Sequence, residues 1–210
     1  MVTKATVINT INNLSEVIIE NSEMLNDLDR AIGDADHGIN MKRGFLKVKT
    51  TMESTEINDI GHAFKTVGMT LLTSVGGASG PLYATAFLKF ADQCKGNETI
   101  DLGTFENMLD AAIAGMMHRG KSDAGCKTML DVWIPYTNTL KNENANGNTF
   151  VDALSKSMVA AHEGFEYSKT IIATKGRASY LGERSLGHGD PGAASTVLIL
   201  KSLSDMFQEA

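Results

Sequence analysis

Three carboxylates fall within eight residues in the stretch Leu28-Asp-Arg-Ala-Ile-Gly-Asp-Ala-Asp-His-Gly-Ile-Asn-Met41. Asp and Gly are poor helix formers, so the segment from Gly33 to Gly38 predicts a tight loop between two helices. Acidic side chains crowded into one loop repel one another unless a positive group lies between them. The stretch therefore indicates either a site for a hard divalent cation or a solvated acidic turn in which Asp29 caps a helix.

The cation interpretation favours Mg²⁺, because this ion binds few carboxylates and completes its shell with water and phosphate oxygens. It predicts a cup of carboxylates that holds Mg²⁺ for a nucleotide. The alternative needs only that Asp-rich turns are common on protein surfaces. This stretch alone leaves both interpretations open.

Composition limits the class of protein. The 210 residues are 42% hydrophobic and 21% charged, which is typical of one globular domain. The net charge of −6 disfavours nucleic acid or an anionic membrane as a partner. Two cysteines, Cys94 and Cys126, form no disulfide framework and fit a reducing compartment. With neither a signal peptide nor an apolar run long enough to span a membrane, we expect a cytoplasmic protein.

Apolar residues recur at spacings of three and four along most of the chain, and no stretch alternates as a strand does. Mostly short connections imply antiparallel neighbours. The pattern predicts an all-α fold of about eight helices in a single domain, residues 1–210. The expected helices cover residues 4–26, 39–52, 57–72, 81–94, 104–119, a segment from 128, 149–174 and 191–207.

A second unusual stretch is Gly76-Gly-Ala-Ser-Gly-Pro81, just before a predicted helix. The backbone N–H groups at a helix N-terminus, preceded by glycines and serine, form a natural phosphate cradle. No Lys-Ser or Lys-Thr pair follows the glycines, so this is not a Walker A loop. A plain turn between two helices is the alternative.

The third unusual stretch runs from Lys175 to Gly192 and is long for a connector inside a compact domain. It carries Arg177, Arg184, His188, Asp190 and Pro191. Long ordered loops of this kind are usually functional, so we expect this one to be ordered around a ligand.

Helix count predicts that these stretches meet. If eight helices alternate up and down, the first, third, fifth and seventh connections share one end of the bundle. All four are polar and glycine-rich: 33–38, 76–80, 120–127 and 175–192. There, His37 and Asn40 are candidate phosphate donors, and Arg177 is placed to neutralise charge in phosphoryl transfer. A hydrogen bond within its own loop is the alternative for His37, and a surface ion pair is the alternative for Arg177.

Four motifs in this order resemble the nucleotide-binding L subunit of bacterial dihydroxyacetone kinases over essentially the whole chain. They are the segments 28–44, 76–83, 127–133 and 175–192, with Cys126 where relatives often carry Asp. The resemblance implies an eight-helix antiparallel up-and-down barrel with the nucleotide at one end and two Mg²⁺ ions on Asp29, Asp34 and Asp36. With Arg177, these aspartates are the expected catalytic residues. The nucleotide contacts that it implies are His37, Gly38, Ile39, Asn40, Ala78, Ser79, Gly120, Met129, Arg177, Gly189, Asp190 and Pro191.

Chain length discriminates within this family. ATP-dependent members fuse this module to the substrate-binding module, whereas a free-standing chain resembles the phosphotransferase-system type. There, a K subunit binds dihydroxyacetone (glycerone), and an M subunit fed by phosphoenolpyruvate rephosphorylates ADP on the L subunit. Residues 175–192 are then the expected lid over ADP or ATP, while a homodimer is left open. Two alternatives are a kinase subunit for another acceptor, such as a fatty acid on a carrier protein, and a non-catalytic nucleotide-sensing regulator.

Overall fold

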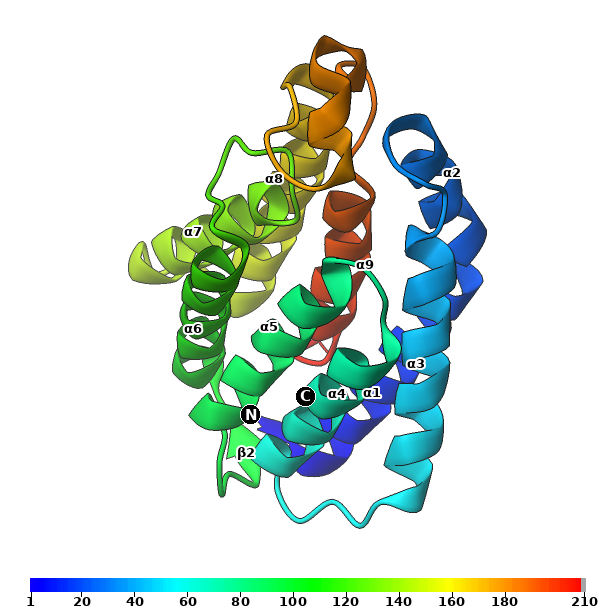
Figure 1. Cartoon of the computed structure of the whole chain (residues 1–210). Helices are drawn as coiled ribbons and strands as arrows, with labels where there is room; N and C mark the ends of the chain where they lie inside the picture. The colour runs from blue at the N-terminus through cyan, green and yellow to red at the C-terminus, as the bar shows by residue number, and fades with distance from the viewer. Residues whose placement is uncertain (209–210) are drawn as a thin grey trace.

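The computed structural model describes residues 1–208 and is almost entirely helical (Figure 1). This confirms the predicted all-α class. A pair of two-residue strands, β1 (Val2–Thr3) and β2 (Thr99–Ile100), pairs antiparallel and was not predicted. The helices are α1 (Lys4–Glu20), α2 (Ser22–Ile32), α3 (His37–Ser54), α4 (Ile60–Ser74), α5 (Ser79–Gln93), α6 (Leu102–Gly120), α7 (Leu130–Ala145), α8 (Phe150–Thr170), the 3₁₀ helix η1 (Arg177–Ser185) and α9 (Pro191–Asp205).

The first predicted helix, residues 4–26, is two helices separated at Asn21. The side chain of Asn21 donates to the Val17 carbonyl at 2.8 Å and so competes with the helical hydrogen-bond pattern. The second helix then continues to Ile32, because Leu25, Asp29 and Ile32 are buried at helical spacing. Both α1 and α2 pack against α3, so together they act as one arm of the bundle and the predicted up-and-down order is kept.

The helices form a closed ring. Each long helix from α3 to α9 packs against the next, and α9 returns to pack against α1 and α2. Figure 1 shows α9, in red, between α8 and the α1–α3 side of the molecule. Helix α9 is buried over most of its length. Its small residues, such as Ala193, Ala194 and Ser195, let the neighbouring helices pack close to it. The ring is the expected antiparallel barrel.

Aromatic side chains from three helices fill the centre of the ring. The Phe90 ring on α5 packs edge-to-face against Phe64 of α4 at 5.5 Å and Trp133 of α7 at 6.0 Å between centroids. Phe87 joins the same cluster at 5.7 Å from Phe90. Edge-to-face pairs add to the free energy gained by burying these large rings. The cluster ties together elements that carry the third and fifth connections.

No helix within residues 1–208 combines the length and the apolar character needed to cross a membrane.

Helices α7 and α8 approach closely at Gly164. A Cβ atom at this position would lie 2.1 Å from the carbonyl oxygen of Asp131. We predict that Gly164→Ala lowers the free energy of unfolding by about 1–3 kcal/mol through overpacking, although alanine is the better helix former. Chemical denaturation measures the change.

Gly103→Ala is the matched control, because it also replaces a helical glycine. The nearest atom to a Cβ there is the Asp101 Oδ1 atom at 3.8 Å. This variant should unfold within about 0.5 kcal/mol of wild type. Equal stability of the two variants would contradict the close approach of α7 and α8.

Candidate functional site

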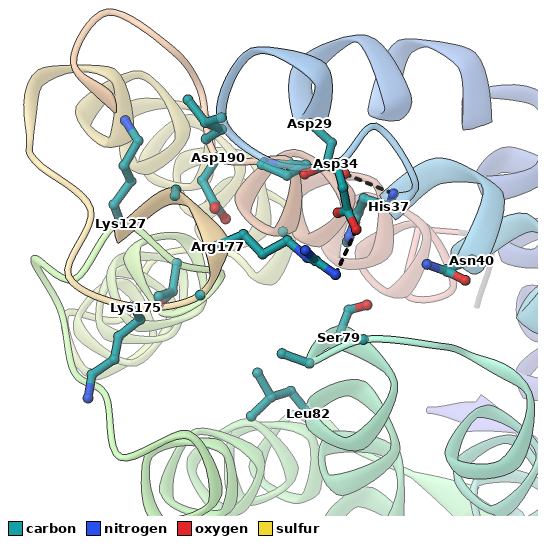
Figure 2. A pocket seen from close by; sticks show the side chains of 18 of the residues that line it. Asp29, Asp34, His37, Asn40, Ser79, Leu82, Lys127, Lys175, Arg177 and Asp190 are labelled. Carbon is teal, nitrogen blue, oxygen red and sulfur yellow. Dashed lines mark hydrogen bonds and ion pairs between the residues drawn. The ribbon is translucent and has the colours of Figure 1, made fainter. Parts of the chain in front are cut away.

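One cavity of about 260 Å³ is lined by residues from all four odd-numbered connections (Figure 2). The segments that enclose it are Asp29–Asn40, Gly76–Leu82, Gly120–Thr128 and Lys175–Gly192. The predicted meeting of these four connections at one end is therefore confirmed. The volume is just below the usual range for small-molecule sites, about 300–1,000 Å³.

The acidic loop is built around Asp29, which lies in the last turn of α2 and is buried. The Oδ2 atom of Asp29 accepts the backbone N–H groups of Asp36 at 2.9 Å and His37 at 3.2 Å. Asp29 thus caps the N-terminus of the following helix, α3. Gly33 leaves room for this carboxylate, because a Cβ there would lie 2.0 Å from the Asp29 Oδ1 atom. The backbone then turns sharply at Ala35, whose φ is 59°.

Three carboxylates converge beside this turn. Ligand oxygens of Asp29, Asp34 and Asp36 all lie within 4.8 Å of one another. Each pair of such charges repels by about 1 kcal/mol in bulk water, and by more where solvent is excluded. Arg177 supplies one positive charge, with its Nη2 atom 2.8 Å from the Asp34 Oδ2 atom. A net negative charge remains, and an oxygen donor set of this kind fits Mg²⁺.

Three helix N-termini line the cavity, those of α3, α5 and α9. Two are capped by carboxylates of this chain: Asp29 caps α3, and Asp190 accepts the Ala193 N–H at 2.7 Å at the start of α9. The N-terminus of α5 has Ala78 at the cap position and no side-chain cap. Its first N–H groups lack intrahelical partners. The α5 terminus is therefore the one best able to receive a phosphate group.

His37 is buried at the start of α3 and lies at the end of a hydroxyl network. Its Nε2 atom is 3.0 Å from the Ser195 Oγ atom, which is 2.6 Å from the Tyr83 hydroxyl. The alternative that His37 bonds within its own loop is therefore wrong, because its partner comes from α9. Burial lowers the pKa of His37 to about 4, against the opposing influence of Asp29 and Asp36. The ring is neutral near pH 7.

Two further polar groups face the cavity. The Asn40 Oδ1 atom accepts from Arg43 Nη2 at 2.7 Å, so the amide NH₂ of Asn40 remains as a donor. Burial raises the pKa of the Asp190 carboxyl to about 7, and Asp131 acts in the same direction. The Ala193 N–H and the Lys127 ammonium oppose this shift.

The structure brings many of the predicted nucleotide contacts together. Those that line the cavity are His37, Asn40, Ala78, Ser79, Gly120, Arg177, Asp190 and Pro191. Four others lie outside the cavity lining. Gly38 faces the Ser22 carbonyl and Gly189 faces the Phe165 ring, whereas Met129 is buried and Ile39 is 56% exposed. The roles of all these residues stay predictions.

Several lining residues were not singled out from the sequence as contacts. Leu82 lies one turn after Ser79 on α5, and helical spacing would have found it. Lys175 and Gly176 lie in the long loop beside Arg177. Lys127 is the least expected, because lysine side chains are usually exposed and nothing in the local sequence indicates that this one is buried, at 1% exposure.

Comparison with known proteins decides the family. The pattern of the DAK2 domain matches residues 31–205. This chain belongs to the DAK2 domain family. It is 46% identical over 193 residues to the "PEP-dependent dihydroxyacetone kinase 1, ADP-binding subunit DhaL" of Listeria innocua, covering 92% of this chain and 91% of that protein. It is 41% identical to the "PEP-dependent dihydroxyacetone kinase, ADP-binding subunit DhaL" of Escherichia coli, covering 94% of each.

Longer proteins also resemble this chain. The chain is 30% identical to the "Triokinase/FMN cyclase" of Rattus norvegicus and spans only 34% of it. Among solved structures, the native form of the dihydroxyacetone kinase of C. freundii superposes with a TM-score of 0.73 at 23% identity. The match covers 96% of this chain and 34% of that one. The same kinase in complex with AMP-PNP and Mg²⁺ gives a TM-score of 0.70 at 23% identity. These structures share the fold of this chain.

Metal linkage tests the carboxylate cluster. A ligand that binds only the folded state raises the free energy of unfolding by about 2.7 kcal/mol at a hundredfold excess over its Kd. We predict that Mg²⁺ with ADP raises the unfolding temperature of the wild type, and that Asp36→Asn removes most of the increase. Thermal unfolding with and without MgCl₂ measures it.

Glu56→Gln is the control, because it removes one exposed negative charge from the α3–α4 connection, which lines no part of the cavity. It should respond to Mg²⁺ as the wild type does. An undiminished response in Asp36→Asn would count against the three carboxylates as metal ligands.

Proposed function

We propose that this chain is the ADP-binding subunit of a phosphoenolpyruvate-dependent dihydroxyacetone kinase. Bound ADP receives a phosphoryl group from a phosphotransferase-system M subunit. The ATP formed passes its terminal phosphoryl group to dihydroxyacetone held on a K subunit. The nucleotide acts as a bound coenzyme, and residues 1–210 form a single nucleotide-binding domain.

The observation that carries this proposal is the length of the match. The chain covers 91% and 94% of two free-standing ADP-binding subunits, but about a third of the longer kinases. The two free-standing relatives are named as ADP-binding subunits of a kinase, which supports a substrate held on another chain. The names of these relatives give no support to another acceptor, and the presence of all four motifs beside three aspartates argues against a purely regulatory role.

Phosphoryl transfer is mainly positioning and charge neutralisation, so the site needs no nucleophile of its own. The uncapped N-terminus of α5 would receive phosphate oxygens, with His37 and Asn40 as further donors. Two Mg²⁺ ions on Asp29, Asp34 and Asp36 would neutralise phosphate charge when bound. Arg177 would shift from Asp34 to the charge that develops on the transferred group.

The long loop supports retention of the nucleotide. Residues Ile171–Asp190, which we call the lid, connect α8 to α9 and include η1. The lid carries Arg177 to the carboxylates on the opposite side of the cavity (Figure 2). Lid opening would have to precede the release of nucleotide, and such steps limit the rate in many enzymes.

Single-turnover transfer tests the proposal. The chain is loaded with ATP and Mg²⁺ and mixed with dihydroxyacetone and the K subunit of a relative. We predict that Arg177→Gln slows formation of dihydroxyacetone phosphate by at least about a hundredfold, because a positioned arginine contributes strongly to phosphoryl transfer.

Arg184→Gln is the matched control, since Arg184 lies in the same lid, is exposed and forms no ion pair within residues 1–208. It should transfer at the wild-type rate. A wild-type chain that binds ATP but transfers nothing to dihydroxyacetone would overturn the proposed function.

A further inference from the structure

One sequence motif, Lys127-Thr-Met-Leu-Asp-Val-Trp133, contributes Lys127 and Thr128 to the cavity lining, but the phosphoryl-transfer steps proposed above use neither residue. Its local structure is set by Asp131, which is buried in the first turn of α7. The Asp131 carboxylate accepts the backbone N–H groups of Gly125 at 2.5 Å and Thr128 at 2.7 Å. The turn between them holds Lys127 at a φ of 58°, a conformation that side-chain-bearing residues seldom adopt. The motif thus forces the Lys127 side chain inward.

The Lys127 ammonium is buried and fully hydrogen-bonded. It donates to the carbonyl oxygens of Ser168 at 2.5 Å and His188 at 2.6 Å, with Ile171 at 3.4 Å. An ammonium has three N–H donors, and three carbonyls receive them. Burial lowers the pKa of Lys127, while Asp190 and Asp131 act against this. In Figure 2 the amino group points away from Arg177 and Asp34, so it is engaged by the backbone and not by the carboxylate cluster.

Two of the three carbonyls, those of Ile171 and His188, lie at the two ends of the lid, and the third, that of Ser168, lies in the last turn of α8 just before it. Ile171 follows the last residue of α8, and His188 lies just before Asp190 at the cap of α9. The first residue of the lid and a residue near its end therefore both bind the Lys127 ammonium. Weaker bonds reinforce this base: the Gly187 N–H donates to the Lys169 carbonyl at 2.8 Å, and the Asp190 N–H donates to Ser168 Oγ at 3.1 Å.

We propose that Lys127 is a positioning residue that clamps both ends of the lid and so slows release of the bound nucleotide. The retention role rests on the proposed function. The clamp acts through Arg177, which lies on the lid between the two held ends and pairs with Asp34 at the cavity. A lysine that merely stabilised the α8 C-terminus would give a different result, because its loss would weaken the whole fold and not the lid in particular.

Hydrogen exchange of the nucleotide-free chain tests the clamp directly. In the wild type, amides at the lid base, such as Thr174, Gly187 and Asp190, are hydrogen-bonded. We predict that Lys127→Met exchanges the lid amides about tenfold to a hundredfold faster, the range expected from loss of hydrogen bonds to a charged group. Amides of α4 and α5 should keep wild-type rates. Lys127→Arg, which retains charge and donors, should restore part of the protection.

The control is Lys141→Met, which removes an exposed lysine paired with Asp110. It should leave lid exchange unchanged. Unchanged lid exchange in Lys127→Met would overturn the clamp, as would an equal rise across α4, α5 and the lid. If Lys127→Met does not fold, Lys127→Gln decides, because glutamine keeps a polar side chain at the buried position but removes the charge and the three donors that meet the Ser168, Ile171 and His188 carbonyls. It should speed lid exchange severalfold, and wild-type exchange there would overturn the clamp.

Release of a fluorescent ADP analogue in MgCl₂ tests the retention role by stopped flow. Lys127→Met should release the nucleotide about tenfold to a hundredfold faster than wild type, with little change in the association rate. Equal release rates would overturn the retention role while leaving the proposed function intact. A wild-type chain that binds no ADP would overturn both, whereas the exchange experiment would still report on the clamp.

Discussion

The site depends on holding three like charges within 4.8 Å of one another. Asp29 lies in the last turn of α2, and the N-terminus of α3 lies directly against its carboxylate. The N–H groups at the α3 N-terminus, where the helix dipole is positive, stabilise the buried carboxylate. Asp34 and Asp36 follow on a turn too short to separate them. A single arginine from the lid offsets part of the charge, and the net negative charge that remains supports the proposed Mg²⁺ site.

The N-termini of three helices line the rest of the cavity, and they differ in whether a side chain caps them. Asp29 and Asp190 cap α3 and α9, which leaves the bare N-terminus of α5 opposite the carboxylates. Beneath them, the Tyr83 hydroxyl joins α5 to α9 through Ser195 and fixes the neutral His37 ring. Cations occupy the lid side: Arg177 lies over the carboxylates and Lys127 lies under the lid base. Positive charge at this end of the barrel thus comes from Arg177 on the lid and from Lys127 beneath its base, although the chain as a whole is acidic.

The helix periodicity and the composition of the loops predicted the all-α fold and the meeting of four connections. The unexpected break at Asn21 leaves the order of the connections unchanged, because α1 and α2 both pack against α3. Local patterns did not reveal contacts made across the chain. Lys127 meets carbonyls 41 and 61 residues away, and His37 meets Ser195 158 residues away. Nor did the motifs tell which of their residues face inward: Asn40 lines the cavity, whereas Gly38 packs against α2.

The central claim is that the end of this barrel holds a nucleotide together with a pair of Mg²⁺ ions. Native mass spectrometry of the purified full chain tests it most directly, because protein, nucleotide and metal are weighed as one assembly. We predict a principal species heavier than the 22.5 kDa chain by one ADP and two Mg²⁺ ions, either as purified or after addition of both. A species that stays at the mass of the bare chain in the presence of excess Mg²⁺ and ADP would contradict it.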